Sequence, residues 1–365
     1  MPDERAPLES WQIGPWNRWS YQHVGEVVPT VPVPTGDAPG AWPVRPVAAL
    51  DALASPPDLD GLVVLHDGVL VHERYANGMT PGTRHLSQSV AKSVLGLLAG
   101  VLVGRGDLDV DAPVADLVPE IASGGYAGAT VRHLLDMTAA TGFVEDYVVE
   151  FWRYDIACGW APPREGAPAR TILDYLATIP PAPDGRRHGD AFQYASPNTD
   201  LLGIVVERAG GAPLATLLAR ELWAPMGAEA DAELAVDPVG VAVASGGLCA
   251  TVRDYARIGA LVLDGGRGVL PAAWVAGLGR GDAAAWGRRA WPADGDGTTG
   301  YAAQWWTLDG RTVARGIHGQ LVAVDRDAGV VVAACSSWPA AENDLAFAAQ
   351  RLMVSEICDT LTGRS

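Results

Sequence analysis

Two residues with the chemistry of a nucleophile and a base stand three positions apart in Ser89-Val90-Ala91-Lys92. On a helix this spacing places the hydroxyl and the amine one turn apart on the same face. A neutral amine there can take the proton from a serine that attacks a carbonyl carbon. Lys92 is also the only lysine of the chain, because every other member of the Lys+Arg total of 26 is an arginine. Since guanidinium stays protonated, the one retained lysine is expected to act as a base.

The Ser-x-x-Lys pair is expected to lie at the start of a buried helix. Residues 94–103 are apolar on nearly all sides, Ser87 can cap the N-terminus, and Gly104 or Gly106 can end the helix. Free backbone N–H groups and the helix dipole at this end favour a developing oxyanion. Burial disfavours the charged amine and lowers its pKa toward a usable range.

Strand patterns occur at both ends of the chain. Residues 61–65 and 69–75 flank Asp67-Gly68, and Asp-Gly between two β-rich runs is a strong hairpin signal. Further strands are predicted at 312–315, 320–324 and 330–335, followed by an amphipathic helix at about 342–361.

Helical patterns dominate between these strands, from about residue 110 to 265. We therefore predict an α+β protein whose antiparallel sheet is built from N- and C-terminal segments, flanked by helices, with an inserted, mostly helical region. The predicted organisation is an extended arm (1–45), an α/β subdomain (46–108 and 266–365) and a helical subdomain (109–265). The site is expected in the cleft between the two subdomains.

Composition excludes several classes of function. With 365 residues and 48% hydrophobic content the chain can bury a large core, and a net charge of −17 opposes binding to nucleic acid or anionic membranes. The N-terminus has no signal-like segment and no apolar run is long enough for a bilayer, so we expect a cytoplasmic protein. Four dispersed cysteines and seven histidines without a ligand-like pair predict free thiols, no metal and no cofactor.

Three motifs occur in order: Ser89-Val90-Ala91-Lys92, Tyr194-Ala195-Ser196 and His318-Gly319-Gln320, the last expected on a strand. In this order and spacing they resemble the serine β-lactamase and penicillin-binding superfamily over roughly residues 60 to 355. The resemblance is closest to the class C β-lactamase-like branch that contains 6-aminohexanoate-dimer (nylon oligomer) hydrolases and related esterases. It implies a β-lactamase-like fold.

The resemblance also implies roles for particular residues. Ser89 would be the acylated nucleophile and Lys92 its base, while Tyr194 would relay the proton to the leaving group and then help to activate water. The backbone N–H groups of Ser89 and Leu321 would form the oxyanion hole. The remaining motif residues, expected to contact substrate, are Ser196, His318, Gly319 and Gln320.

Two departures from the superfamily pattern limit the substrate. The Lys-Thr-Gly motif that many β-lactamases and peptidases use to hold a carboxylate cannot exist, because Lys92 is the only lysine, and His318 stands in its place. Loss of that cation argues against an efficient β-lactamase or cell-wall peptidase. Ser196 occupies the place of the asparagine of class C enzymes, which puts amide recognition by this residue in doubt.

A segment rich in aromatic and acidic residues, 143–160, resembles the loop over the cleft of nylon oligomer hydrolases. By resemblance, Tyr147 would bond the scissile amide nitrogen and Asp155 would attract the amino end of the substrate, with Trp160 as a further contact. The alternative is that these residues only pack a lid.

The sequence therefore predicts a serine hydrolase that cleaves small amides or esters through a Ser89 acyl-enzyme, most similar to 6-aminohexanoate-oligomer amidases with esterase activity. The alternatives are a carboxylesterase without amidase activity, a β-lactamase or DD-peptidase-like enzyme, and a non-catalytic binding protein. The expected partner is a small-molecule amide or ester, and a homodimer is possible.

Overall fold

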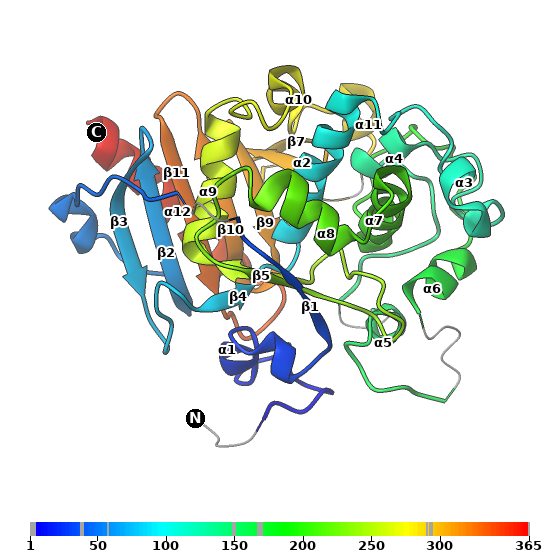
Figure 1. Cartoon of the computed structure of the whole chain (residues 1–365), viewed down its shortest axis with the longest axis horizontal. Helices are drawn as coiled ribbons and strands as arrows, with labels where there is room; N and C mark the ends of the chain where they lie inside the picture. The colour runs from blue at the N-terminus through cyan, green and yellow to red at the C-terminus, as the bar shows by residue number, and fades with distance from the viewer. Residues whose placement is uncertain are drawn as a thin grey trace.

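The computed structural model describes residues 5–36, 40–56, 58–147, 151–165, 171–289, 291 and 295–363. Seven described strands form an antiparallel sheet in the order β3-β2-β11-β10-β9-β8-β7 (Figure 1). Segments far apart in the sequence thus lie side by side, because β2 pairs with β11. The strands are β2 (Leu59–His66), β3 (Val69–Tyr75), β7 (Thr298–Ala302), β8 (Trp305–Leu308), β9 (Arg311–Gly316), β10 (Gln320–Asp325) and β11 (Val330–Ser336).

The β2–β3 hairpin confirms the prediction made from Asp67-Gly68. Both turn residues have positive φ, +49° for Asp67 and +74° for Gly68, as a two-residue turn between twisted strands requires. The hairpin forms one end of the sheet, and the predicted C-terminal strands lie within β9, β10 and β11.

A second sheet has the order β1-β5-β6-β4. The N-terminal segment, predicted as an extended arm, contributes β1, which pairs with β5. Two of its strands come from the region predicted to be mostly helical, where their short lengths gave little signal. The four strands are β1 (Thr30–Val33), β4 (Arg84–Leu86), β5 (Ala232–Ala235) and β6 (Leu248–Thr251).

Helix α2 (Val90–Arg105) is the predicted buried helix, and Gly106 ends it with φ +81°. The predicted cap at Ser87 is wrong: Ser89 is the N-cap residue, and the Ser87 hydroxyl donates to the carbonyl of Gln88 instead. Because the Ser89 side chain makes no capping bond, its hydroxyl remains available for chemistry.

Helices cover both faces of the large sheet. Successive residues of a strand point to opposite faces of the sheet. On one face, Val322 and Val331 belong to a core cluster with Ile258 of α9 (Val252–Leu263). On the other face, Leu321 and Val332 belong to a second cluster. The second cluster includes residues of α12 (Asp344–Thr362). This apolar packing on both faces explains the continuous hydrophobic run of the C-terminal strands.

The other helices lie mainly on the side of α2 and α7 (Ser196–Gly210) in Figure 1. Helix α9, which the sequence assigned to the helical subdomain, contacts β2, β10 and β11 and therefore packs on the sheet. Sheet and helices together confirm the predicted α+β class. The remaining α-helices are α1 (Asn17–Ser20), α3 (Val114–Leu117), α4 (Val131–Leu135), α5 (Trp152–Ala157), α6 (Ile172–Thr178), α8 (Leu214–Leu218), α10 (Ala272–Gly277) and α11 (Ala283–Gly287).

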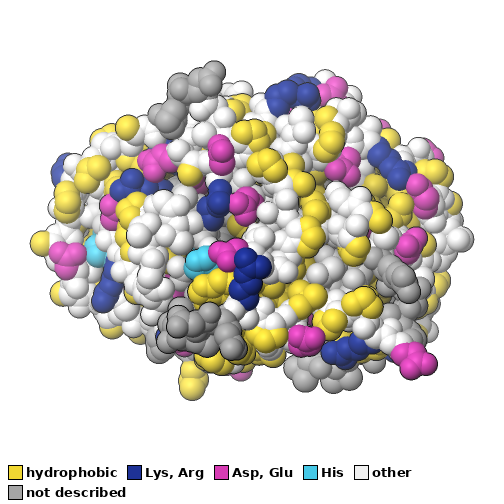
Figure 2. All heavy atoms as spheres, turned by 60° about the horizontal axis from the view of Figure 1, so that its bottom comes forward, with side chains coloured by type: hydrophobic (Ala, Val, Ile, Leu, Met, Phe, Trp, Pro, Cys, Tyr) yellow, Lys and Arg dark blue, Asp and Glu magenta, His cyan; other side chains and the backbone are white. Residues whose placement is uncertain are grey.

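Acidic and basic side chains are interspersed over the face shown in Figure 2, with hydrophobic side chains between them. Within the described ranges no single helix has the length and apolarity needed to cross a membrane; on those two criteria alone, one bent pair, Ser196–Gly210 with Leu214–Trp223, passes.

Candidate active site

Ser89 and Lys92 meet at the N-terminal end of α2. The ammonium nitrogen Nζ of Lys92 lies 2.9 Å from Ser89 Oγ and 2.7 Å from the backbone carbonyl oxygen of Ser245. The helical spacing read from the sequence thus places base and nucleophile within hydrogen-bonding distance. A neutral Lys92 in this position can accept the Ser89 proton directly.

Burial prepares Lys92 for this role. The side chain is 1% exposed, and burial lowers the pKa of Lys92 to about 8, while the negative charges of Glu145 and Asp200 act in the opposite direction. A useful fraction of the amine is therefore neutral near physiological pH.

A buried polar cluster holds the carbonyl group that accepts from Lys92. The backbone N–H of Ser245 donates to Asp200 Oδ1 at 2.8 Å, and the Ser245 and Tyr154 hydroxyls lie 2.7 Å apart. Tyr154 also donates to Asp200 Oδ2. Burial raises the pKa of Asp200 to about 6, so this carboxyl is ionised where Lys92 titrates.

The residue before the nucleophile has a strained backbone. Gln88 has φ +47°, a left-handed conformation that non-glycine residues seldom adopt. Its side-chain amide donates to Tyr21 Oη at 2.9 Å and to Gln12 Oε1 at 3.2 Å, and both partners come from the N-terminal segment. That segment therefore helps to fix the turn that presents Ser89.

Tyr194 lies beside the pair as a neutral phenol. Burial raises the pKa of Tyr194, whereas a hydrogen bond with the Ser89 side chain and the positive charge of Arg315 lower it. Lys92 Nζ lies 5.3 Å from the centroid of the Tyr194 ring. The Ser89 hydroxyl therefore links the phenol to the amine of Lys92.

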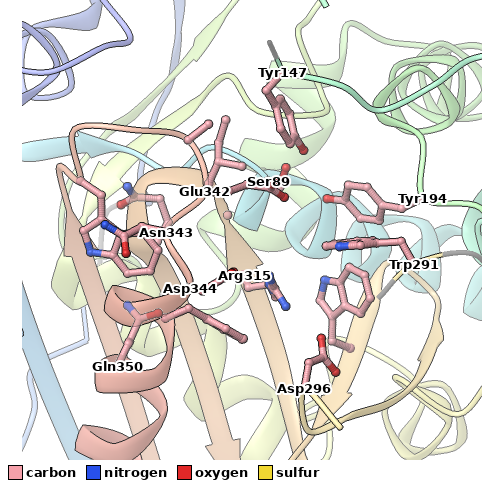
Figure 3. Close-up of a pocket in the computed structure, with 17 residues that line it drawn as sticks. Ser89, Tyr147, Tyr194, Trp291, Asp296, Arg315, Glu342, Asn343, Asp344 and Gln350 are labelled. Atoms are coloured by element: carbon pink, nitrogen blue, oxygen red, sulfur yellow. The ribbon is translucent and has the colours of Figure 1, made fainter. Parts of the chain in front are cut away.

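Ser89, Tyr147 and Tyr194 open into a cavity of about 350 Å³ (Figure 3). Their side chains converge on one side of it, Trp291 lies next to Tyr194, and Arg315 lies across the cavity from Ser89 and Tyr147. The Tyr194 ring stacks on Trp306 at 5.3 Å, which fixes the orientation of the phenol. The further lining residues are Asp296, Trp306, Gly316, Ile317, Gln320, Trp338, Ala341, Glu342, Asn343, Asp344, Phe347 and Gln350.

The predicted oxyanion-hole contribution of Leu321 requires correction. Leu321 lies on β10, is buried in the hydrophobic cluster beneath the sheet, and does not line this cavity. The backbone that approaches Ser89 belongs to Gly316, because a β-carbon there would lie 2.8 Å from the Ser89 nitrogen. Ile317 follows it and lines the cavity, so its N–H replaces that of Leu321 as the candidate partner of the Ser89 N–H.

The His318-Gly319-Gln320 motif forms a turn rather than a strand. Residues Ile317–Gly319 are a short 3₁₀ segment between β9 and β10, with φ +60° at His318 and +88° at Gly319. Gln320 begins β10, and its amide donates to the carbonyls of His318 and Ser336. Among the three, Gln320 lines the nucleophile cavity, His318 lines a neighbouring one, and Gly319 packs against Trp338.

His318 does not supply the missing cation. Burial lowers its pKa to about 4, and Nδ1 lies 2.7 Å from the carbonyl oxygen of Trp338. The imidazole is therefore neutral at physiological pH. Among the residues that the structure describes, the basic side chain that lines the nucleophile cavity is Arg315, three residues earlier.

The polar groups of Ser196, the third residue of Tyr-Ala-Ser, are hydrogen-bonded to Glu145. Its backbone N–H and hydroxyl donate to Glu145 Oε2 and Oε1 at 2.7 and 2.5 Å. Tyr147 donates to the same carboxylate at 2.9 Å. Glu145 thus ties the loop to the Tyr194 motif, and Ser196 lines neither of the two cavities beside the nucleophile.

The three loop residues singled out in the sequence, Tyr147, Asp155 and Trp160, line a second cavity of about 920 Å³. Tyr147, Ile317, Ala341 and Glu342 line both cavities, so the two meet beside the nucleophile.

In this second cavity burial raises the pKa of Asp155 to about 7. Trp160 stacks edge-on with Trp11, and its indole nitrogen has no hydrogen-bond partner among the described residues.

Several residues of the site escaped the sequence analysis. Ser245 acts through a backbone carbonyl, which leaves no side-chain signal. Arg315 reaches the cavity only through the tertiary position of β9, which a single sequence does not reveal. The described residues contain no group of three or more His, Cys, Asp or Glu side chains arranged to hold a metal ion.

The sheet order, the covering helices and the Ser-x-x-Lys-Tyr arrangement define a serine hydrolase of the β-lactamase type. A family model described as Beta-lactamase matches residues 60–354, and the chain belongs to this family. The predicted β-lactamase-like fold and superfamily are thus confirmed.

Hydrolases are prominent among similar proteins. The 6-aminohexanoate-dimer hydrolase of Paenarthrobacter ureafaciens is 37% identical over 354 residues, covering 91% of this chain and 88% of the relative. Esterase EstB of Burkholderia gladioli is 33% identical over 147 residues, 38% of this chain and 36% of the relative. A solved structure from Bacillus anthracis, named as a candidate 6-aminohexanoate-dimer hydrolase, covers 98% of this chain and 97% of its own with a TM-score of 0.86 at 24% identity, which shows the shared fold.

Proposed function

We propose that the protein hydrolyses short linear amides of the 6-aminohexanoate-dimer type, and the corresponding esters, through an acyl-enzyme on Ser89. The observation that carries the proposal is the 2.9 Å contact between a buried Lys92 and Ser89 in a cavity shared with Tyr147 and Tyr194. The full-length similarity to a 6-aminohexanoate-dimer hydrolase supports the choice of substrate.

In the proposed acylation step, neutral Lys92 accepts the Ser89 proton while Ser89 Oγ attacks the substrate carbonyl carbon. Negative charge develops on the carbonyl oxygen, which the N–H groups of Ser89 and Ile317 stabilise. Tyr194 passes a proton to the leaving nitrogen or oxygen and regains one from Lys92. The carbon–nitrogen or carbon–oxygen bond then breaks and leaves the acyl group on Ser89.

In deacylation a water molecule takes the place of the leaving group. Tyr194 accepts the proton of the water while it passes its own phenolic proton to neutral Lys92, the resulting hydroxide attacks the acyl carbonyl, and Lys92 returns this proton to Ser89 Oγ as the ester bond breaks. Tyr147 is assigned to the scissile amide nitrogen because its hydroxyl group lies in the cavity of Ser89. Amide leaving groups need this help more than alkoxides do.

The second cavity is assigned to the acyl half of the substrate. Asp155, Glu145 and Asp146 line it together with aromatic side chains, a combination that suits an ammonium group on an aliphatic chain. Asp155 attracts the cation in its ionised form, so this contribution grows as pH rises through about 7.

Intact-mass measurement after exposure to a fluorophosphonate or a p-nitrophenyl ester tests the proposed chemistry. A single adduct is expected on the wild type and none on Ser89→Ala. An equal adduct on both proteins, or none on the wild type, contradicts the mechanism. No adduct on any variant would instead favour a non-catalytic binding protein.

A carboxylesterase without amidase activity is the second candidate, favoured by the similarity to Esterase EstB and by the Tyr147 hydroxyl already donating to Glu145. A panel of p-nitrophenyl esters, linear amide dimers and nitrocefin on one preparation separates the candidates. Hydrolysis of esters alone selects the esterase, and rapid nitrocefin turnover selects the β-lactamase alternative.

A cytoplasmic location is part of the proposal and is supported by four free, buried cysteines. A homodimer stays a prediction that sedimentation can check.

A further inference from the structure

Arg315 is the basic side chain among the described residues that line the nucleophile cavity. It is on β9, one residue before Gly316, whose backbone is packed against the Ser89 nitrogen. Figure 3 shows its guanidinium projecting into the cavity on the side of Asp296, across from Ser89 and Tyr147. A fixed positive charge therefore lies close to the reacting centre.

The guanidinium of Arg315 is held by rings rather than by an anion. Its central carbon lies 4.2 Å from the ring centroid of Phe347, 5.6 Å from that of Trp306 and 5.7 Å from that of Trp291. Nη1 is buried and has no hydrogen-bond partner within the described part of the chain. A buried N–H donor without a partner is costly unless a ligand completes it.

Acidic groups surround this position without pairing with it. Asp296, Glu342 and Asp344 line the same cavity, and the charges of Asp296 and Glu342 act on Arg315 from a distance, since no ion pair within 4.0 Å joins them in the described chain. They disfavour a free dianion, whereas one carboxylate that reaches Nη1 on a neutral or cationic substrate gains a charge-assisted hydrogen bond.

The position of Arg315 relative to Tyr194 indicates which half of the substrate would lie near Arg315. Tyr194 is proposed to deliver the proton to the leaving group, and the positive charge of Arg315 lowers the pKa of its phenol. The acidic second cavity lies on the other side of Tyr147 and Ile317. A chain with its ammonium end in the acidic cavity would therefore carry its opposite end toward Arg315.

We propose that Arg315 binds a carboxylate on the leaving-group half of the substrate, so that the enzyme prefers amides or esters whose amine or alcohol portion ends in an anion. The inference rests on the proposed function, because it assigns the two cavities to the two halves of one substrate. In this proposal Arg315 takes over the carboxylate binding that the lysine of the Lys-Thr-Gly motif provides in many β-lactamases, with N–H donors of fixed direction.

The test compares two substrates with the same acyl half, the 6-aminohexanoate dimer and its C-terminal carboxamide. The wild type is expected to prefer the carboxylate by roughly tenfold or more in kcat/KM, since a hydrogen bond to a charged partner changes affinity by about that factor. Arg315→Gln is expected to abolish the preference, mainly through KM, and Arg315→Lys to retain part of it. Arg280→Gln, an exposed arginine at a separate surface cavity, is the matched control and is expected to leave the preference intact.

A binding measurement separates failure of this inference from failure of the proposed function. Calorimetry on Ser89→Ala with 6-aminohexanoate and with 6-aminohexanamide needs no turnover, and only the acid is expected to lose affinity when Arg315→Gln is added. The inference is overturned if the wild type shows no preference, if the preference survives in Arg315→Gln, or if that variant weakens both ligands equally. If the wild type forms no Ser89 adduct but the acid still loses affinity in the Arg315→Gln variant, the acyl-enzyme mechanism is contradicted and the anion site is supported.

Discussion

At the scale of single residues, the proton balance of Lys92 is open to direct measurement. With a pKa near 8, kcat/KM for a neutral ester is expected to rise with pH through this value, because only the uncharged amine accepts the Ser89 proton. Asp200→Asn removes a charge that raises the pKa of Lys92, so the rise should move to lower pH. The pH profile of each variant gives the shift.

Asp327→Asn, at the exposed turn after β10, is the control: it also removes one negative charge, but far from the site, and should leave the pH dependence of kcat/KM unchanged. Lys92→Arg should be inactive across the range, since guanidinium keeps its proton. A fully active Lys92→Arg variant, or an unmoved profile in Asp200→Asn, contradicts the assigned roles.

Tyr147→Phe tests the leaving-group assignment. The variant loses the hydroxyl that would bond the scissile nitrogen, so amide hydrolysis should fall roughly tenfold or more, as expected for loss of a hydrogen bond made in the transition state. Hydrolysis of an ester with the same acyl group should fall much less. Equal losses on the two substrates would mean that Tyr147 only supports Glu145 and the loop.

The sequence predicted those site residues whose spacing lies within one element. Ser89 and Lys92 share a helical turn, so their contact follows from helix geometry. Leu321 was misplaced because the turn at His318 and Gly319 shifts the backbone nearest Ser89 upstream to Gly316, and no local pattern reveals that shift. Arg315 and Glu145 act only through tertiary proximity, which one sequence does not encode visibly.

At the scale of elements, the glycines of α2 explain how this helix fits into the molecule. Gly96, Gly100 and Gly104 recur every four residues and form one stripe, against which the β7–β8 turn, Trp274 and Pro271 are packed. A β-carbon at Gly96 would lie 2.2 Å from the carbonyl oxygen of Ala303, whose turn has φ +50°. Gly96 therefore allows α2 to approach the β7–β8 turn closely, and Gly100 and Gly104 leave room for Trp274 and Pro271 at α10.

Gly96→Ala is expected to lower the free energy of unfolding by about 1 to 3 kcal/mol, the usual cost of overpacking a rigid interface. Gly277→Ala is the control, because this exposed helical glycine has no atom within 4 Å of its added carbon and should be neutral or slightly stabilising. Urea unfolding of both variants measures the difference. Equal stability would show that the β7–β8 turn moves away at little cost.

Elements with strong local signals were predicted well, and those defined by their partners were not. The β2–β3 hairpin has an Asp-Gly turn, and β10 and β11 are apolar runs between turns. Strands β5 and β6 are four residues each and exist through pairing with β1 and β4, which lie far away in sequence. Their existence is a tertiary property.

At the scale of the whole molecule, the N-terminal segment forms part of the second cavity, to which we assign the acyl half of the substrate. Trp11 is 1% exposed, donates from its indole nitrogen to the carbonyl of Trp160 at 2.9 Å, and lines the second cavity. Strand β1 and part of the wall of the second cavity thus come from residues that the sequence predicted only as an extended arm.

Trp11→Ala is expected to cost about 3 to 5 kcal/mol of stability, as for other buried tryptophans, and to raise KM for the amide dimer. Trp19→Ala is the comparison, because Trp19 is only partly buried and stacks on His23 outside both cavities. Thermal unfolding and KM are measured on both. A normal KM in a folded Trp11→Ala variant would remove the segment from the site.

The single lysine gives the molecule an unusual analytical property. A lysine-specific protease has one cutting point in the sequence, and that point lies on the buried first turn of α2. Cleavage therefore requires this helix to open, so its rate reports the local opening of the segment that carries the nucleophile. Ligands that occupy the cleft should slow this cleavage, so the rate of proteolysis at Lys92 should report how much of the protein has ligand bound.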